Sequence, residues 1–169
     1  MSNSILEIDR EKLGSFLPDI EQCFISDKAY AILDERWLVE EGYKAYKKWL
    51  ALADLRNWRT NWDCDNLAAS YRLFLQMLHA KHNPYAFTER HNKKVENDTN
   101  VDSIAVGVIY YKNSSASYHA INLAICGSGF EFGRSGNVHT FKRVYIEPEH
   151  GVAIKLTKEE EDSICFVSF

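Results

Sequence analysis

The hydrophobic pattern of this chain changes its period once, near residue 100, and that change constrains the fold most strongly. Before it, apolar residues recur at steps of three and four over 39–54 and 67–78, which predicts one buried face on each of two helices. After it, turn residues separate short runs rich in Val, Ile, Tyr and Phe, at 104–111, 118–126, 141–146 and 163–169. Helices followed by an antiparallel sheet are typical of an α+β fold.

The length predicts a single domain over 1–169, with a mainly helical part at 1–100 and a sheet part at 101–169. The stretch 85–100 has no clear period, which indicates an irregular polar connection. Hydrophobic residues make up 46% of the chain and aromatic residues 13%, which suits a packed core and excludes a disordered chain.

The net charge of −4 gives no electrostatic reason to expect nucleic acid or an anionic membrane as a partner. No segment reaches the roughly 18 apolar residues of a membrane span. The first four residues lack the basic start and apolar run of a signal peptide. We therefore expect a cytoplasmic protein, in the host cytoplasm if the source is a virus.

Four cysteines lie far apart without a C-x-x-C pair, which favours free thiols over a zinc site or a disulfide framework. Cys64 comes just before the second predicted helix, where unpaired N–H groups favour a thiolate. Its neighbours Asp63 and Asp65 oppose this, because nearby negative charge raises the pKa of a thiol. They need another role, such as capping the helix, binding a metal or pairing with Arg56 or Arg59. The alternative for Cys64 is an inert buried cysteine.

Two further residues can complete a catalytic group. His119 lies at the start of an apolar strand, on the same face as Ile121 and Leu123, where it can act as the base for a thiol. Glu147 closes the next strand before Pro148, where it can orient the imidazole. The alternatives are a structural histidine and a solvated turn glutamate.

Taken in order, the motifs at 63–66, 118–122, 145–148 and 163–169 resemble those of a known family. It is the family of small papain-like cysteine peptidases typified by the C-terminal domain of the Marasmius oreades agglutinin, with phage and bacterial relatives. The resemblance covers roughly 58–169. It implies a papain-like α+β fold, with an N-terminal helical half packed on a C-terminal antiparallel sheet.

The resemblance also implies a triad of Cys64 as nucleophile, His119 as general base and acid, and Glu147 as orienting carboxylate. The reaction would be hydrolysis of a peptide or related amide bond through a thioester acyl-enzyme, with a protein or peptide as substrate. Two alternatives remain open. One is a catalytically inactive papain-like module that binds a protein, and the other is an acyl transferase of the transglutaminase or amidase kind.

Calcium enters through the same resemblance, because the agglutinin's protease depends on calcium near its active site. Asp63 and Asp65, with Glu147 as a further candidate, are the expected ligands, since hard cations bind carboxylate oxygens. The thiol chemistry itself needs no cofactor.

The residues that would hold the oxyanion depart from the family pattern. Papain-like enzymes carry a glutamine about six residues before the cysteine to bind the developing charge. Trp58 stands there in this chain. The candidate donors are therefore Asn57, Asn61 and the backbone N–H of Cys64. Trp58 and Trp62 flank the expected cleft and are candidates for lining it.

Overall fold

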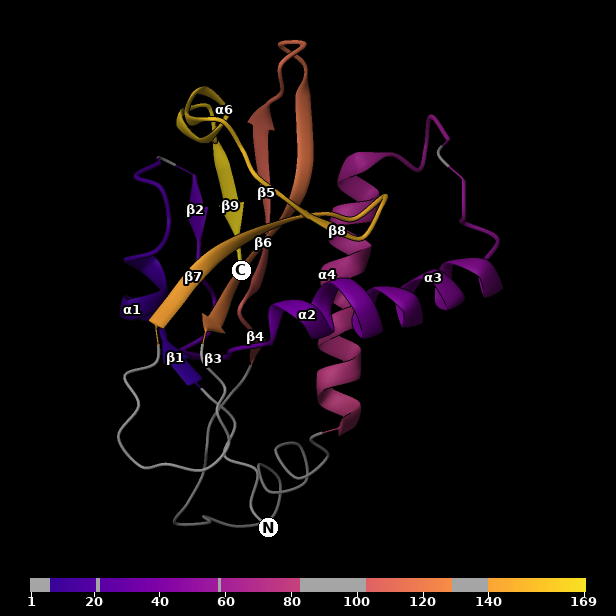
Figure 1. Ribbon diagram of the computed structural model, residues 1–169, viewed down its shortest axis with the longest axis horizontal. Helices are drawn as coiled ribbons and strands as arrows, with labels where there is room; N and C mark the ends of the chain where they lie inside the picture. Colours follow the sequence, from indigo (N-terminus) through magenta and orange to yellow (C-terminus); the bar gives the residue numbers. More distant parts are fainter. Residues whose placement is uncertain (1–6, 21, 58, 83–102, 129–139) are drawn as a thin grey trace.

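The computed structural model describes residues 7–20, 22–57, 59–82, 103–128 and 140–169. Figure 1 shows two sheets and a set of helices around them. The helices are α1 (Arg10–Gly14), α2 (Glu35–Trp37), the π-helical turn Leu38–Gly42, α3 (Tyr43–Leu52), α4 (Cys64–His82) and α6 (Lys158–Asp162). The strands are β1 (Glu7–Asp9), β2 (Cys23–Phe24), β3 (Ala29–Ala31), β4 (Ser103–Ile104), β5 (Val106–Lys112), β6 (Tyr118–Ser128), β7 (Thr140–Glu147), β8 (Val152–Ile154) and β9 (Phe166–Ser168).

The larger sheet has six strands in the order β2-β9-β5-β6-β7-β8. Its centre, β9-β5-β6-β7-β8, is antiparallel, whereas β2 pairs with β9 in parallel. The smaller sheet has the order β1-β3-β4, with β3 and β4 parallel. Both sheets therefore join strands from the first 31 residues to strands that follow residue 102.

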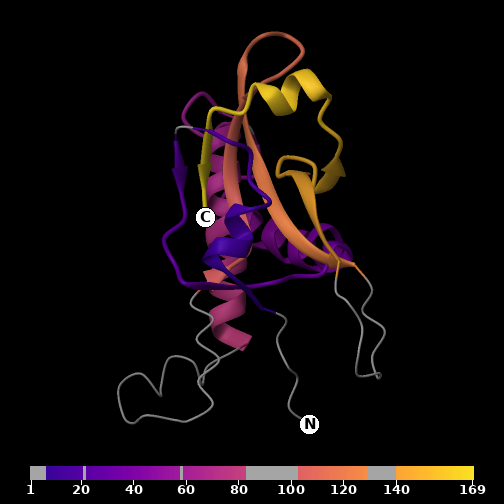
Figure 2. The ribbon, with the colours of Figure 1, turned by 90° about the vertical axis from the view of Figure 1, so that its left-hand side faces the viewer.

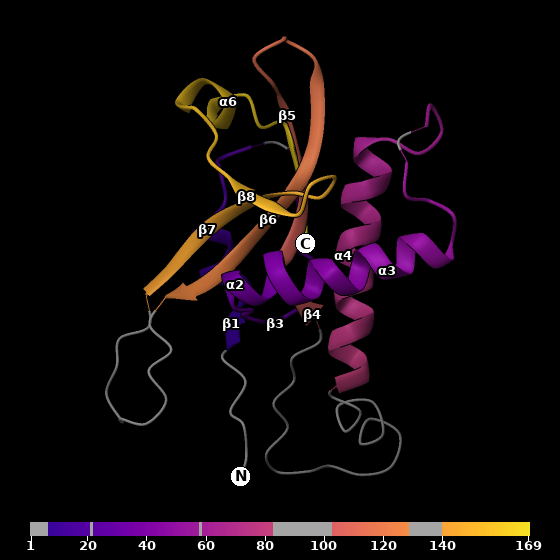
Figure 3. The same ribbon diagram turned by 45° about the vertical axis from the view of Figure 1, so that its right-hand side comes forward.

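Helix α4 packs against one face of the larger sheet, over β5 and β6, and α3 crosses α4 (Figure 3). The α3 and α4 side chains Tyr46, Tyr71 and Leu75 are fully buried there, against Val106 of β5. The Tyr71 hydroxyl donates to the Leu38 carbonyl oxygen at 2.7 Å. This apolar cluster fixes α4, and with it the position of the residue that begins α4.

Helix α1 lies against the opposite face of the sheet (Figure 2). Leu13 of α1 packs there in a cluster with Ile109, Ile121, Val167 and Phe169. Residues from the two ends of the chain meet in this second cluster.

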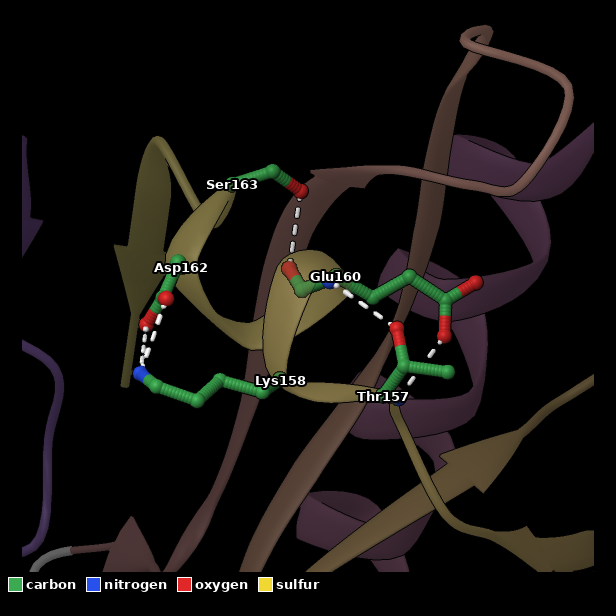
Figure 4. Close-up of polar contacts among 5 residues, drawn as sticks. All are labelled: Thr157, Lys158, Glu160, Asp162 and Ser163. Atoms are coloured by element: carbon green, nitrogen blue, oxygen red, sulfur yellow. Dashed lines mark hydrogen bonds and ion pairs between the residues drawn. The ribbon is translucent and has the colours of Figure 1, made fainter.

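A capping box holds α6 beside the end of β5 (Figure 4). The Thr157 Oγ1 accepts from the Glu160 N–H at 3.2 Å, and the Glu160 carboxylate accepts from the Thr157 N–H at 2.9 Å. The Ser163 Oγ then accepts from the Lys112 N–H at 2.9 Å. The first two bonds satisfy backbone N–H groups at the start of α6, and the Ser163 bond joins the end of α6 to β5.

The papain-like division into an N-terminal helical half and a C-terminal antiparallel sheet is wrong. Strands β1, β2 and β3 all lie within the first 31 residues, and each sheet contains a parallel pair. Two or three residues are too few to show an alternating pattern, so helical periodicity dominated the prediction for this region.

The helix predicted at 67–78 lies within α4, while the one predicted at 39–54 begins earlier, at Glu35, because the Asp34 carboxylate accepts from the Trp37 N–H at 2.8 Å. The predicted connection at 85–100 and the predicted division at residue 100 lie outside the described residues. No helix in the described ranges combines the length and apolarity that a membrane crossing needs.

Candidate active site

Cys64 is the first residue of α4, and the segment before it is tied down locally. Arg59 and Trp62 exchange backbone hydrogen bonds of 3.0 and 2.9 Å. The Leu67 N–H then donates to the Asp63 carbonyl oxygen at 2.9 Å, which closes the first helical turn. The thiol is half-buried, and Cys64 stands at the N-terminal end of the helix.

Asp63 and Asp65 flank Cys64 in the sequence, and their carboxyl groups lie close to one another. A hydrogen bond to Asp65 is the main cause that raises the pKa of Asp63, and burial and the charge of Asp65 add to it. The Asp63 Oδ1 is shielded from solvent and has no hydrogen-bond partner among the described residues. Two acidic side chains that influence each other therefore flank Cys64 at the start of α4.

His119 and Glu147 are brought together by the pairing of β6 with β7. Asn122 lies opposite Ile146, so the register continues with Glu147 opposite Ile121, which is two residues from His119 on β6. Side chains two residues apart point to the same face, so His119 and Glu147 share one face of the sheet. The His119 Nε2 and the Glu147 Oε2 are 2.7 Å apart, with side-chain exposures of 20% and 13%. The hydrogen bond to Glu147 is the main cause that raises the pKa of His119, while burial opposes it.

The partners of this pair limit its movement. The other Glu147 carboxylate oxygen accepts from the Glu149 N–H at 3.2 Å. The ring of Tyr111, directly opposite His119 in the sheet, meets the imidazole edge to face at 5.8 Å between centroids. The imidazole is thus held by a carboxylate on one side and an aromatic ring on the other. This arrangement can stabilise an imidazolium.

Cys64 packs against β6, the strand that carries His119, without a hydrogen bond to His119 or Glu147 among the described residues. The thiol packs with Tyr110 against a small cluster of Ala68, Val108 and Ala120, and Ala120 directly follows His119. The amino end of α4 and the start of β6 lie at the same end of the molecule (Figure 1). Among the residues that the structure describes, no hydrogen bond joins the Cys64 thiol to His119.

The pKa of Tyr111 is affected by both Glu147 and Cys64. Burial chiefly raises its pKa to about 12, and the charges of Glu160, Glu147 and Cys64 contribute. The Tyr111 ring itself contacts His119, so it belongs to the histidine side of the predicted triad.

The remaining predicted residues fall into different surroundings. Asn57 and Asn61 are exposed, and Asn57 lines a hollow formed with α3. Trp62 is half-buried against the apolar cluster of α3 and α4, and its Nε1 has no partner within the described ranges. Trp58 lies outside the described residues.

Asn122 is a buried polar residue whose function the sequence reading missed. Its Nδ2 donates to the Ala68 carbonyl of α4 at 2.9 Å and to the Gly107 carbonyl of β5 at 3.1 Å. It therefore fastens the helix of Cys64 to the strand of His119. The available signal was an amide among the apolar residues of 118–126, on the face predicted to be opposite His119.

The described residues contain no group of three or more His, Cys, Asp or Glu side chains arranged to hold a metal. Calcium takes six to eight oxygens, so Asp63 and Asp65 fit part of such a shell, and backbone carbonyls and water would supply the rest. The unpartnered Asp63 Oδ1 is a free ligand atom for a cation. Both Glu147 oxygens instead have partners within the protein.

No family model matches the sequence, and no curated protein is significantly similar to it. Two solved structures share its fold. A structure described as the PSL1a–E64 complex matches 97% of this chain and 50% of its own, with a TM-score of 0.60 and 17% identity. The Polyporus squamosus lectin, bound to the epitope Neu5Acα2-6Galβ1-4GlcNAc, matches 88% of this chain and 42% of its own, with a TM-score of 0.53 and 19% identity.

This chain thus spans half or less of the length of either protein. A structure that shares the fold carries the name of a lectin, and the two mixed sheets place strands where helices were expected. Together these findings overturn the predicted fold class, in which an N-terminal helical half packs on a C-terminal antiparallel sheet.

Proposed function

We propose that this protein is a thiol hydrolase that cleaves a peptide or related amide bond. The observation that carries the proposal is the 2.7 Å contact between His119 and Glu147, on a sheet against which the helix that begins at Cys64 packs. A base held by a carboxylate, near a nucleophile, is the recurring arrangement of acyl-transfer enzymes. That arrangement occurs on unrelated folds, so the corrected fold does not argue against it.

In the proposed reaction, His119 takes the proton of the Cys64 thiol and the sulfur attacks the substrate carbonyl carbon. The tetrahedral intermediate carries its negative charge on oxygen, where the backbone N–H of Cys64 and the Asn57 or Asn61 amide are candidate donors. The C–N bond then breaks, and the imidazolium gives its proton to the leaving amine. A thioester remains on Cys64.

Water completes the cycle. His119 takes a proton from the water, whose oxygen attacks the thioester carbonyl. The C–S bond breaks, the free acid leaves and the proton returns to the thiolate. Glu147 stabilises the imidazolium that forms in each half of the cycle, which fits the raised pKa of His119.

Two further observations support the proposal. One similar structure is a complex with the protease inhibitor E64, which alkylates activated thiols. The carboxyl pair Asp63–Asp65 lies beside the thiol. A calcium ion held by this pair would neutralise the negative charge that opposes a thiolate.

One observation favours a second candidate, a catalytically inactive binding module. The Cys64 thiol and His119 are not hydrogen-bonded in the described structure. Catalytic hydrogen bonds are often long before substrate binds, so we place the hydrolase first.

E64 labelling followed by peptide mapping tests the proposal. We expect one adduct, on Cys64, and none on the Cys64→Ala protein. Cys165 is the control, because it is an exposed thiol on a different element. Labelling of Cys165 at the same rate as Cys64 would contradict an activated nucleophile. With a peptide substrate, release of a free acid indicates hydrolysis, and transfer to an added amine indicates the acyl transferase.

A further inference from the structure

A charged hollow lies beside the candidate active site, between α3, the segment before α4 and the turn that joins β7 to β8. Its volume is about 260 Å³. Pockets for drug-sized ligands measure about 300–1,000 Å³, so this one suits a single side chain with its adjoining backbone. Lys47, Arg56 and Glu149 bring charge to its walls, and Tyr43, Asn57 and Pro148 lie among them.

One wall of the hollow is rigid and directly connected to Glu147. The Tyr43 hydroxyl donates to the Glu149 carbonyl oxygen at 2.6 Å. Gly151 follows with a φ of 67°, and an added Cβ would overlap the Tyr43 ring. The Glu149 N–H donates to the Glu147 carboxylate that holds His119. A ligand that touches this turn therefore lies near the residues of the proposed reaction.

The charged groups of the hollow are available to a ligand. Within the described part of the chain, no ion pair or side-chain hydrogen bond occupies Lys47, Arg56 or Glu149. The Lys47 Nζ lies over the Tyr43 ring, 5.7 Å from its centroid. Burial, with the charges of Glu147 and Glu149, raises the pKa of Tyr43 to about 12, so its hydroxyl stays protonated at neutral pH. The walls thus offer two cations, one carboxylate and an amide.

We infer that this hollow binds an acidic residue of the peptide substrate, an inference that rests on the proposed function. The substrate carboxylate accepts charge-assisted hydrogen bonds from Lys47 and Arg56. Its backbone N–H donates to the Glu149 carboxylate, and the Asn57 amide can serve either the N–H or the carbonyl. An acidic residue within a peptide combines these complementary groups, whereas a simple anion leaves Glu149 without a donor.

Direct binding tests this inference without requiring hydrolysis. The probes are matched alanine-based hexapeptides that carry one Glu or one Gln at successive positions, and the protein is the Cys64→Ala variant. Calorimetry or NMR titration measures the affinities. We expect one position at which Glu binds about tenfold more tightly than Gln, since a charge-assisted bond is about twice as strong as a neutral one.

Lys47→Gln and Arg56→Gln, each introduced into the Cys64→Ala protein, should reduce that preference about threefold or more while leaving the Gln peptides unchanged. Lys48→Gln is the matched control, because Lys48 is an exposed lysine of the same helix that does not line the hollow. Equal affinity for Glu and Gln at every position would overturn the inference, and so would an equal loss in the Lys48 variant.

The two proposals can fail separately. A preference for Glu in the Cys64→Ala protein, with no hydrolysis by the native protein, supports the hollow as a site and rejects the hydrolase. Hydrolysis by the native protein with no preference for Glu supports the hydrolase and rejects the acidic site.

Discussion

The two halves of the candidate active site differ in how completely their polar groups are paired. His119 and Glu147 lie on adjacent strands. The imidazole contacts the Glu147 carboxylate and the Tyr111 ring, and the Glu149 N–H donates to the other Glu147 oxygen. On the other side, Cys64 begins a helix between two aspartates, and one Asp63 oxygen is shielded from solvent without a partner within the described ranges.

This difference reflects how the fold positions the residues of each half. Strand pairing fixes the relative positions of residues in both directions along the sheet, so the base and its carboxylate are preorganised. The start of a helix is fixed chiefly by the packing of its later turns, here through Tyr71 and Leu75. The geometry of the Cys64 side therefore depends more on ligands, protons and cations.

Breaking the ordered half should have the largest effect. His119→Asn removes the base, and we expect the rate of Cys64 labelling by E64 to fall about 10³-fold, within the range for general bases. His150→Asn is the control, because His150 is exposed in the turn after β7. An unchanged rate in the His119 variant would show that the thiol does not depend on this imidazole.

Replacing the carboxylate should weaken the same half less. Glu147→Gln keeps the size of the side chain but loses the charge that stabilises the imidazolium, so we expect the labelling rate to fall about 10²-fold.

The Glu147→Gln substitution should also change how the free energy of unfolding depends on pH. The folded-state pKa of His119 is raised by Glu147, so the stabilisation is complete below the unfolded value of about 6.5 and is lost as pH rises through the folded value. Urea unfolding should show native protein more stable than Glu147→Gln by about 1–2 kcal/mol at pH 5.5. The difference should shrink at pH 9, and an equal difference at both values would contradict the ion pair.

Removing the link between the two halves tests whether it aligns them. Asn122→Ala leaves the Ala68 and Gly107 carbonyls without their amide donor, so we expect a loss of about 2 kcal/mol in unfolding free energy. The labelling rate of the folded variant should also fall. A variant that loses stability but labels at the native rate would show that Asn122 serves the core alone.

The smallest expected effect concerns the Cys64 side of the site, where one Asp63 oxygen has no partner within the described ranges. Calcium should raise the melting temperature of the native protein by a few degrees, because an ion held by Asp63 and Asp65 binds the folded protein and offsets the closeness of the two carboxyls. Asp63→Asn should lose this response, while Asp54→Asn, an exposed aspartate before the site, should keep it. An equal response in all three proteins would exclude the pair as a calcium site.

The sequence predicted those parts of the fold in which one periodic segment carries its own signal. Helix α4 and the strands β5, β6 and β7 are long enough to show a period, and their predicted positions lie close to the observed ones. Strand β2 has two residues and depends on β9, about 140 positions away, so no local pattern could reveal it. The predicted division into a helical half and a C-terminal sheet failed because local patterns do not show these non-local pairings.

The candidate site follows the same rule. The closeness of His119 and Glu147 follows from the register of two neighbouring strands, which turn residues and alternation restrict. The position of Cys64 beside Ala120 depends instead on how α4 packs across the sheet. The bond of Asn122 to the Ala68 carbonyl likewise depends on that packing, so the sequence showed a misplaced amide without showing its use.

The position of β9 between β2 and β5 has a consequence for synthesis on the ribosome. Strand β2 is made early, but its backbone groups have no partner strand until Phe166–Ser168 emerges. The exposed Phe24 and Cys23 therefore stay without a partner strand while the residues between β2 and β9 are synthesised. Slower elongation should prolong that interval and increase the need for a chaperone, whereas changes in α4 should leave it unaltered.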